Sequence, residues 1–118
     1  KFIKSKKTGK AITLTETTAQ STFKTARRDF IYVKDVAKAF ISTMLSEKTG
    51  NGEVINIGTG KMTAMEDIAK TIGGKVEFIP KRSFEVEAHQ ADMTLCNKLL
   101  DWKPSVKILD WLAEFVKK

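Results

Sequence analysis

The hydrophobic pattern in the central part of the chain predicts a strand that leads directly into a helix. An apolar, β-prone run extends from Phe30 to Val33, and after Asp35 apolar residues recur at the three-and-four spacing of one buried helix face. These helical positions are Val36, Ala37, Phe40, Ile41, Met44 and Leu45. We expect Asp35 to be the helix N-cap, because its carboxylate can accept hydrogen bonds from the free amides of the first turn.

The segments around this unit predict further short elements. Residues 1–10 have the pattern of a helix end closed by Gly9, Ala11–Thr15 alternates as a short strand does, and the polar stretch Glu16–Lys24 is expected to be a loop. Later elements are expected as a strand over 53–57 buried on both faces, a helix over 63–72, a strand over 75–79, a helix over 91–100 and a last helix capped by Ser105. This order predicts an α/β fold with a small sheet flanked by helices, built as one domain over residues 1–118.

A glycine-containing turn leads into the helix expected at 63–72. Thr63 and Glu66 have the spacing of a capping box, in which each side chain satisfies a free amide at the helix start. Gly58-x-Gly60-x-x-Thr63 also imitates a dinucleotide-binding fingerprint, and Glu77 stands about where a ribose-binding acid would. That fingerprint belongs to the first strand of a long sheet, and too little chain follows to build one. We therefore favour a purely structural turn.

The charge adds little to this picture. The formal net charge is +7, with eighteen lysines against three arginines, and the lysines are spread along the chain. No helix-turn-helix, zinc or aromatic-platform signature accompanies them, so nucleic-acid binding is not the favoured interpretation. A mild preference for anionic ligands is all that the charge supports.

The cysteine and histidine content bounds the compartment and the chemistry. Cys96 is the only cysteine and lies in an apolar helical pattern, which favours a reduced, cytoplasmic setting and a core role. His89 is the only histidine, so no histidine metal cluster and no metal site is expected. We expect no membrane segment and no signal peptide. The chain begins at Lys1 without a methionine, which we interpret as a processed chain or a piece of something longer.

Two basic pairs are the candidate binding residues. Arg27-Arg28 stands at the mouth of the central strand, and Lys81-Arg82 follows the strand expected at 75–79. If the fold brings the pairs together, they form a diphosphate clamp, because guanidinium groups bind phosphate oxygens in a bidentate manner. If it does not, they are ordinary surface charge. The neighbouring acids Glu85 and Glu87 are interpreted as part of a solvated loop.

Several motifs, in order along nearly the whole chain, resemble one enzyme family. The motifs are Arg28-Asp29-Phe30-Ile31-Tyr32-Val33-Lys34-Asp35-Val36-Ala37, then Asn56-Ile57-Gly58-Thr59-Gly60, then Pro80-Lys81-Arg82, then Ala91-Asp92, and last Leu99-Leu100-Asp101-Trp102-Lys103-Pro104. Together they resemble the C-terminal, substrate-binding region of NAD-dependent nucleotide-sugar epimerases and dehydratases, which are extended short-chain dehydrogenases. Each motif is weakly specific alone, and the series is specific.

The resemblance implies a substrate site, a cofactor and partners. Arg28 and Arg82, with Arg27 and Lys81 beside them, are implied to bind the diphosphate of a nucleoside-diphosphate sugar, and the segment from Ile12 to Lys24 is implied to lie along its base. NAD(P) is implied for the complete enzyme, held on an N-terminal Rossmann domain, and no cofactor for this chain alone. The resemblance allows a homodimer. The fold is implied to be that of the C-terminal substrate domain without the Rossmann nucleotide-binding core.

The sequence also departs from the family pattern. Ser83-Phe84 replaces the commoner Pro-Gly, and the loop before the signature lacks glycine. Family members use a Tyr-x-x-x-Lys pair, whereas the only tyrosine is Tyr32 and Val36 stands four residues later. We therefore expect no catalytic residue and no hydride chemistry in this chain, and we expect it to be a fragment of a longer epimerase or dehydratase.

Two other classes of function remain as alternatives. One is a stand-alone, non-enzymatic module that binds a ligand or nucleic acid, for which the only argument is the charge of +7. The other is a small dinucleotide-binding protein built on the turn from Gly58 to Thr63.

Overall fold

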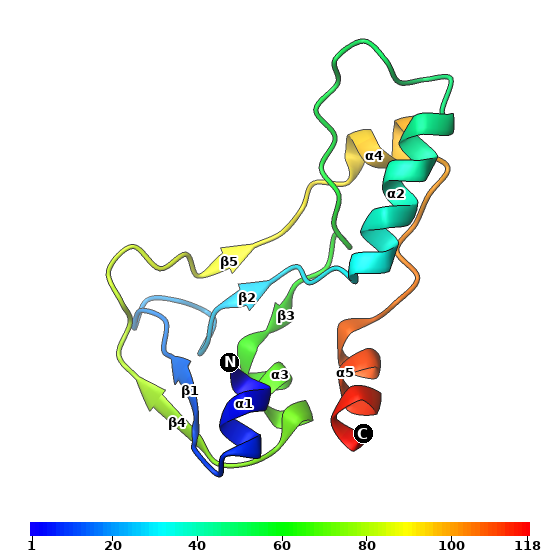
Figure 1. Cartoon of the computed structure of the whole chain (residues 1–118). Helices are drawn as coiled ribbons and strands as arrows, with labels where there is room; N and C mark the ends of the chain where they lie inside the picture. Colours follow the sequence, from blue (N-terminus) through cyan, green and yellow to red (C-terminus); the bar gives the residue numbers. More distant parts are fainter.

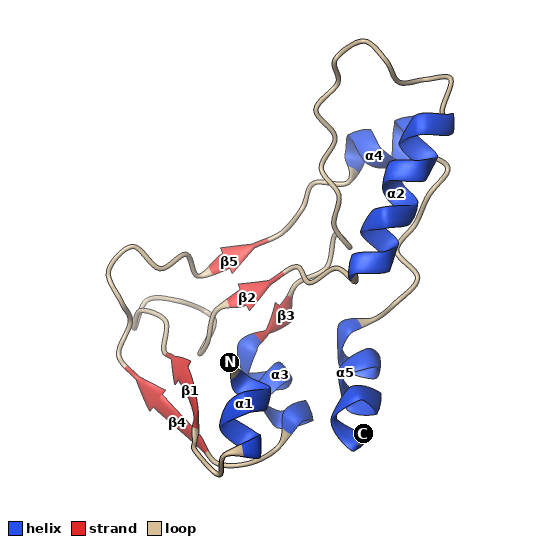
Figure 2. Ribbon diagram, in the orientation of Figure 1, coloured by secondary structure: helices blue, strands red, loops and turns tan.

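The structure is a computed structural model that describes residues 1–118, and it is a mixed α/β fold as predicted (Figure 1). Its elements, in chain order, are α1 (Phe2–Lys7), β1 (Ile12–Thr15), β2 (Arg27–Arg28), α2 (Val33–Leu45), β3 (Thr63–Ala64), α3 (Met65–Ile72), β4 (Val76–Ile79), β5 (Ala88–His89), α4 (Thr94–Leu99) and α5 (Ile108–Lys117). Long irregular segments connect α2 to β3 and β4 to β5 (Figure 2). The longest helix, α2, has 13 residues, and none combines the length and apolar character needed to cross a membrane.

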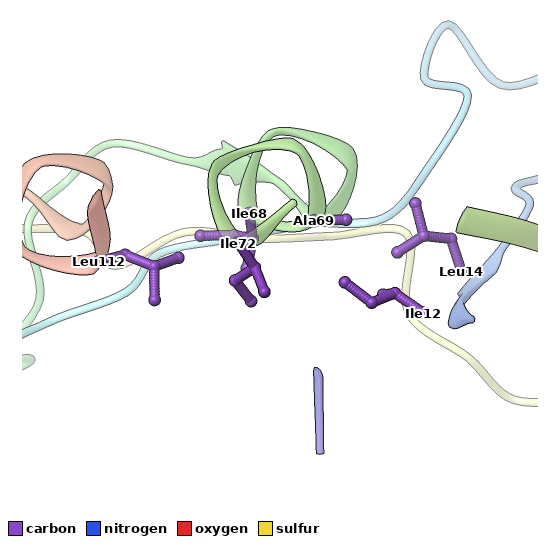
Figure 3. Packing of buried hydrophobic residues seen from close by; sticks show 6 residues of the cluster. All are labelled: Ile12, Leu14, Ile68, Ala69, Ile72 and Leu112. Carbon is purple, nitrogen blue, oxygen red and sulfur yellow. The ribbon is translucent and has the colours of Figure 1, made fainter. Parts of the chain in front are cut away.

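The first of two hydrophobic cores lies where β1 and β4 meet α3 and α5. β1 pairs in parallel with β4, with Ile12 opposite Val76 and Leu14 opposite Phe78. The buried residues of this core are Ile12, Leu14, Ile68, Ala69, Ile72 and Leu112 (Figure 3). The helix end, the first strand and the last helix are therefore confirmed, because each places apolar residues against this core. The strand at 75–79 is confirmed by its pairing with β1, although Val76 and Phe78 are exposed.

The second core lies between α2 and α4. It consists of Ala39, Cys96, Leu100 and Trp102, with Ile55 and Ile57 of the long connection packed against it. Burial raises the pKa of the Cys96 thiol, because the apolar surroundings disfavour the thiolate. Cys96 is thus the core residue that the sequence predicted.

A three-stranded sheet of very short strands joins the two cores. β2 pairs antiparallel with β3 and parallel with β5, so the strand order is β3-β2-β5. Figure 1 shows this sheet between the part of the molecule with α1, α3 and α5 and the part with α2 and α4. β2 thereby places Arg27 and Arg28 at the middle of the molecule.

The strand and helix boundaries of the central unit differ from the prediction. The run from Phe30 to Val33 is not a strand, because the paired residues lie earlier, at Arg27 and Arg28. The helix begins at Val33, with Tyr32 rather than Asp35 in the N-cap position. Asp35 lies inside the first turn, where its carboxylate bonds to a distant segment instead of capping its own helix.

Asp35 connects α2 to the chain that leads into α5. Its carboxylate accepts hydrogen bonds from the Ser105 amide at 2.8 Å, the Ser105 hydroxyl at 2.7 Å and the Val106 amide at 2.9 Å. Burial alone would raise the pKa of Asp35, but these hydrogen bonds hold the pKa below its ordinary value. Ser105 is therefore not the cap of the last helix, whose N-cap is Lys107.

The apolar face predicted for the central helix is largely exposed. Phe40, Ile41, Met44 and Leu45 have exposed fractions of 66%, 57%, 83% and 78%. Only Asp35 and Ala39 of α2 are buried. The prediction of a buried face was wrong for this chain because no element of the chain covers that side of the helix.

Two further local predictions were wrong for related reasons. Residues 53–57 form no strand, because no other strand lies beside them to pair, and Val54 is 86% exposed. Thr63 and Glu66 form no capping box, because Thr63 lies in β3 and α3 begins at Met65. The Glu66 amide instead donates to the Thr25 hydroxyl at 3.3 Å, so a residue from another segment supplies the cap.

The protein is more extended than a compact domain of its size. Its radius of gyration is 17.0 Å, against about 13.5 Å for a typical domain of this length. It exposes 8455 Å², whereas a compact monomer of this mass exposes about 6,400 Å². About 2,000 Å² of surface is therefore exposed beyond the expectation for a compact monomer.

Candidate functional site

β2 brings the two basic pairs of the sequence into the same part of the molecule. The Arg27 amide donates to the Glu87 carbonyl at 2.8 Å, and β2 continues alongside β5, with Arg27 opposite Ala88 and Arg28 opposite His89. The loop of residues 81–87, which carries Lys81 and Arg82, runs directly into β5. The fold therefore places the loop of the second basic pair against the strand of the first.

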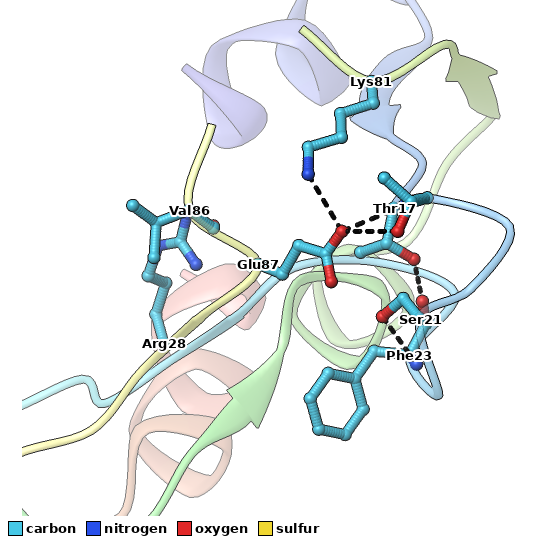
Figure 4. Close-up of polar contacts among 8 residues, drawn as sticks. Thr17, Ser21, Phe23, Arg28, Lys81, Val86 and Glu87 are labelled. Atoms are coloured by element: carbon cyan, nitrogen blue, oxygen red, sulfur yellow. Dashed lines mark hydrogen bonds and ion pairs between the residues drawn. The ribbon is translucent and has the colours of Figure 1, made fainter. Parts of the chain in front are cut away.

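The Arg28 side chain also contacts this loop. Its Nη2 donates to the Val86 carbonyl at 2.6 Å, and Figure 4 shows the Arg28 side chain beside Val86. Its Nη1 donates to the Arg27 carbonyl at 2.8 Å. A guanidinium has five N–H donors, so two bonds leave donors available for an anion. Arg28 is half-buried.

Arg27 is directed elsewhere. Successive side chains of a strand point to opposite faces, so Arg27 and Arg28 do not line one surface. The Arg27 guanidinium carbon lies 4.4 Å from the centroid of the Phe23 ring, which is a cation–π contact. Its Nε is buried and makes no hydrogen bond. Arg27 therefore packs against the loop before β2.

Lys81 and Glu87 connect the two loops of the site. Lys81 Nζ lies 2.9 Å from Glu87 Oε1, and the same oxygen accepts from the Thr18 amide at 3.1 Å and the Thr18 hydroxyl at 3.0 Å. The Lys81 ammonium, with help from Thr18 and Ser21, lowers the pKa of Glu87 to about 2. Figure 4 shows the Lys81 side chain directed at the Glu87 carboxylate. Glu87 is thus not a solvated acid, contrary to the prediction.

The space between the two loops is almost filled. The cavity lined by Thr15, Glu16, Thr17, Ala26, Lys81, Glu85, Val86 and Glu87 holds about 10 Å³, which is about the smallest volume that accommodates one water molecule. Arg82, at the start of the same loop, is exposed. A ligand larger than water therefore does not fit between the two loops, whereas Arg82 is open to solvent.

The glycine turn binds an acid of the chain itself. The Asp29 carboxylate accepts from the Thr59 amide at 2.9 Å, the Gly60 amide at 2.8 Å and the Ala91 amide at 3.2 Å. The amides that would hold a phosphate in a dinucleotide fingerprint are therefore occupied by Asp29. A Cβ at Gly58 would lie 2.4 Å from the Ala91 Cβ, so glycine is needed there for packing. Both findings favour the structural turn.

Sequence reasoning identified the cations of this region and missed the acids that organise it. Asp29 lies in the motif from Arg28 to Ala37, but the sequence alone indicated no role for it, and Glu87 was interpreted as part of a solvated loop. The only signal in the sequence was the position of each acid beside basic residues. Apart from Lys81, which is six residues from Glu87, the partners of these acids named above lie 30 to 69 residues away along the chain, so local spacing does not identify them.

Comparison with known proteins places the chain in a family. Residues 1–58 match the model of the NAD dependent epimerase/dehydratase family. The chain is 30% identical over 96 residues to a UDP-glucose 4-epimerase of Mycolicibacterium smegmatis, covering 76% of this chain and 30% of that protein. It is 31% identical over 99 residues to a UDP-glucuronate 4-epimerase of Thermodesulfobacterium geofontis, covering 78% and 30%. The chain thus spans about a third of the length of these curated relatives.

Solved structures agree with this result. The UDP-glucuronic acid 4-epimerase of Bacillus cereus in complex with UDP-glucuronic acid and NAD has a TM-score of 0.78 at 26% identity, over 98% of this chain and 38% of that one. The UDP-N-acetylglucosamine 4-epimerase of Methanobrevibacter ruminantium in complex with UDP-N-acetylmuramic acid has a TM-score of 0.77 at 28% identity, over 99% and 37%. The chain belongs to the NAD-dependent epimerase/dehydratase family and corresponds to a short part of its members.

Proposed function

We propose that this chain is the part of an NAD-dependent nucleotide-sugar epimerase or dehydratase that binds the nucleoside-diphosphate sugar. The observation that carries the proposal is the contact of the Arg28 guanidinium with the 81–87 loop, at 2.6 Å from the Val86 carbonyl. Arg28 and Arg82 are the residues that bind the diphosphate. The relatives and neighbours named above act on or hold UDP sugars, which supports this class of ligand.

The charges of the region suit a diphosphate. Arg28 keeps free N–H donors after its two bonds to carbonyls, and Arg82 is exposed, so both can donate to phosphate oxygens without breaking a bond of the fold. Lys81 and Arg27 add positive potential beside them. Because each is engaged, Lys81 with Glu87 and Arg27 with Phe23, they act mainly by holding the loops in place.

The residues of this chain do not fit NAD. The amides of the glycine turn already donate to Asp29, so they leave no cradle for a pyrophosphate. No Tyr-x-x-x-Lys pair occurs in the sequence. The chain alone is therefore proposed to bind substrate without catalysing the reaction, while cofactor binding and acid–base chemistry belong to another domain.

The exposed face of α2 supports a second domain as partner. Five large apolar side chains of this helix are more than half exposed, and the protein as a whole exposes about 2,000 Å² beyond the value for a compact monomer. A standard interface buries about 800 Å² on each partner. We assign this face to an N-terminal Rossmann domain that holds NAD, because the relatives are about three times as long as the matched chain.

Titration calorimetry with UDP tests the proposed site. Replacing Arg28 or Arg82 by alanine should weaken binding by about 10- to 100-fold each, since a hydrogen bond to a charged group contributes about 1.5–3 kcal/mol. Lys117→Ala, at the far end of α5, is the control and should bind as the unaltered protein does. Unchanged affinity in both arginine variants would refute the proposed site.

A further inference from the structure

Phe84 has a backbone conformation that phenylalanine rarely adopts. Its φ is +64°, and it is the only residue other than glycine with positive φ in the protein. The Glu85 amide donates to the Arg82 carbonyl at 3.3 Å, so residues 82–85 form a β-turn with Phe84 in the third position. Positive φ at that position alone is typical of a type II turn, which favours glycine because a Cβ crowds the backbone there.

The side chain of Phe84 contributes nothing to the fold that would offset this strain. It is fully exposed, at 101% of its reference area. A strained residue that the fold does not require points to a role in binding.

The turn that carries Phe84 is fixed on both sides. Before the turn, Lys81 is paired with Glu87, and Glu87 is bonded to Thr18 on the neighbouring loop. After the turn, the Val86 carbonyl accepts from Arg28. The ring is therefore held at the surface on an anchored loop, which reduces the ordering that ligand binding would require.

We propose that Phe84 stacks on the nucleobase of the bound nucleoside diphosphate. This inference rests on the proposed function, in which Arg28 and Arg82 bind the phosphates. Phe84 follows Arg82 by two residues in one tight turn, and a nucleoside diphosphate carries its base one ribose away from its phosphates. An aromatic ring stacks on any base, so Phe84 distinguishes nucleotides from other phosphate compounds without selecting among bases.

The test measures binding of UDP and of inorganic pyrophosphate to the intact protein and to three variants. Phe84→Gly relieves the turn and removes the ring, Phe84→Leu keeps an apolar side chain under the same backbone strain, and Phe84→Tyr keeps a ring. Phe84→Gly should bind UDP about 5- to 100-fold more weakly, the range expected for one stacked base, with unchanged affinity for pyrophosphate. Phe84→Leu should also lose most of the UDP affinity, and Phe84→Tyr should keep it.

Stability provides an independent readout. Phe84→Gly should melt at the same or a higher temperature than the unaltered protein, because the glycine relieves the strained φ, so lost UDP affinity would not come from unfolding. Unchanged UDP affinity in the glycine and leucine variants would overturn the role of Phe84. Equal losses for UDP and pyrophosphate would also overturn it, since the loop shape would then matter and not the base. Binding of neither ligand by the unaltered protein would overturn the proposed function itself.

Discussion

Replacing Asp35 by alanine should destabilise the protein by about 3 kcal/mol. The carboxylate is 1% exposed and accepts three hydrogen bonds from Ser105 and Val106. A bond to a charged group contributes about 1.5–3 kcal/mol, so the three set an upper bound of about 4.5–9 kcal/mol. Ser105 is exposed, so water can replace part of what its amide and hydroxyl lose. We therefore expect a loss between about 2 and 4 kcal/mol.

Urea unfolding followed by tryptophan fluorescence measures this loss. Trp102 and Trp111 lie on either side of the Ser105 segment, so both report on its release. Lys38→Ala is the matched control: Lys38 lies 3.8 Å from the same carboxylate but is 64% exposed, and its removal should cost at most about 0.5 kcal/mol. Equal effects of the two substitutions, or a loss below about 1 kcal/mol for Asp35→Ala, would refute the assignment of Asp35 as a buried cross-link.

Three further predictions follow from the same structure. Gly58→Ala should lower the free energy of unfolding by about 1–3 kcal/mol, because its Cβ would meet the Ala91 Cβ and the Asp29 carboxylate. The control is Gly52→Ala, at an open position, which should lower the free energy of unfolding by no more than the strain of its positive φ. Equal losses in the two variants would contradict the packing argument. Because the pKa of Glu87 is about 2 in the fold and ordinarily 4.5, its link to Thr18 should be complete above pH 4.5 and lost as the pH falls towards 2. Hydrogen exchange of the Thr18 amide should follow that change, and a Glu87→Gln variant with the same pH profile would rule it out. The double substitution Met44→Gln and Leu45→Gln should change the free energy of unfolding of this chain by no more than about 0.5 kcal/mol, because both side chains are exposed. The same substitutions should lower the melting temperature of a protein in which the Rossmann domain covers these side chains. A large loss of stability in this chain alone would show that the α2 face is already buried.

The sequence predicted those elements whose apolar residues are covered by other parts of the same chain. β1 and α5 were expected nearly where they lie, because their alternating or helical patterns face the first core. β4 was also expected where it lies, but its pairing with β1 fixes it there, since Val76 and Phe78 are exposed. The strand expected at 53–57 and the buried face of α2 were not found. No other element covers the apolar face of α2. Residues 53–57 have no strand to pair with, although Ile55 and Ile57 pack against the second core.

The candidate site was predictable only in part for a different reason. Basic pairs at Arg27 and Lys81 are visible as local composition, and their proximity depends on the parallel pairing of β2 with β5. Asp29 bonds to residues far away in the chain, and Glu87 joins the nearby Lys81 to the distant Thr18. Thr25 likewise replaces the expected capping box at the start of α3. Spacing along the sequence carries no information about such long-range bonds.

The parallel pairing of β1 with β4 also has a consequence for biosynthesis. Ile12 lies opposite Val76, so the first strand of the chain has no partner until 64 more residues have been made. At the usual rates of translation this interval is roughly 3–13 s. Throughout it, Ile12 and Leu14, which are buried in the finished protein, stay accessible on a strand with two open edges. The nascent protein should therefore depend on chaperones at the ribosome until β4 emerges.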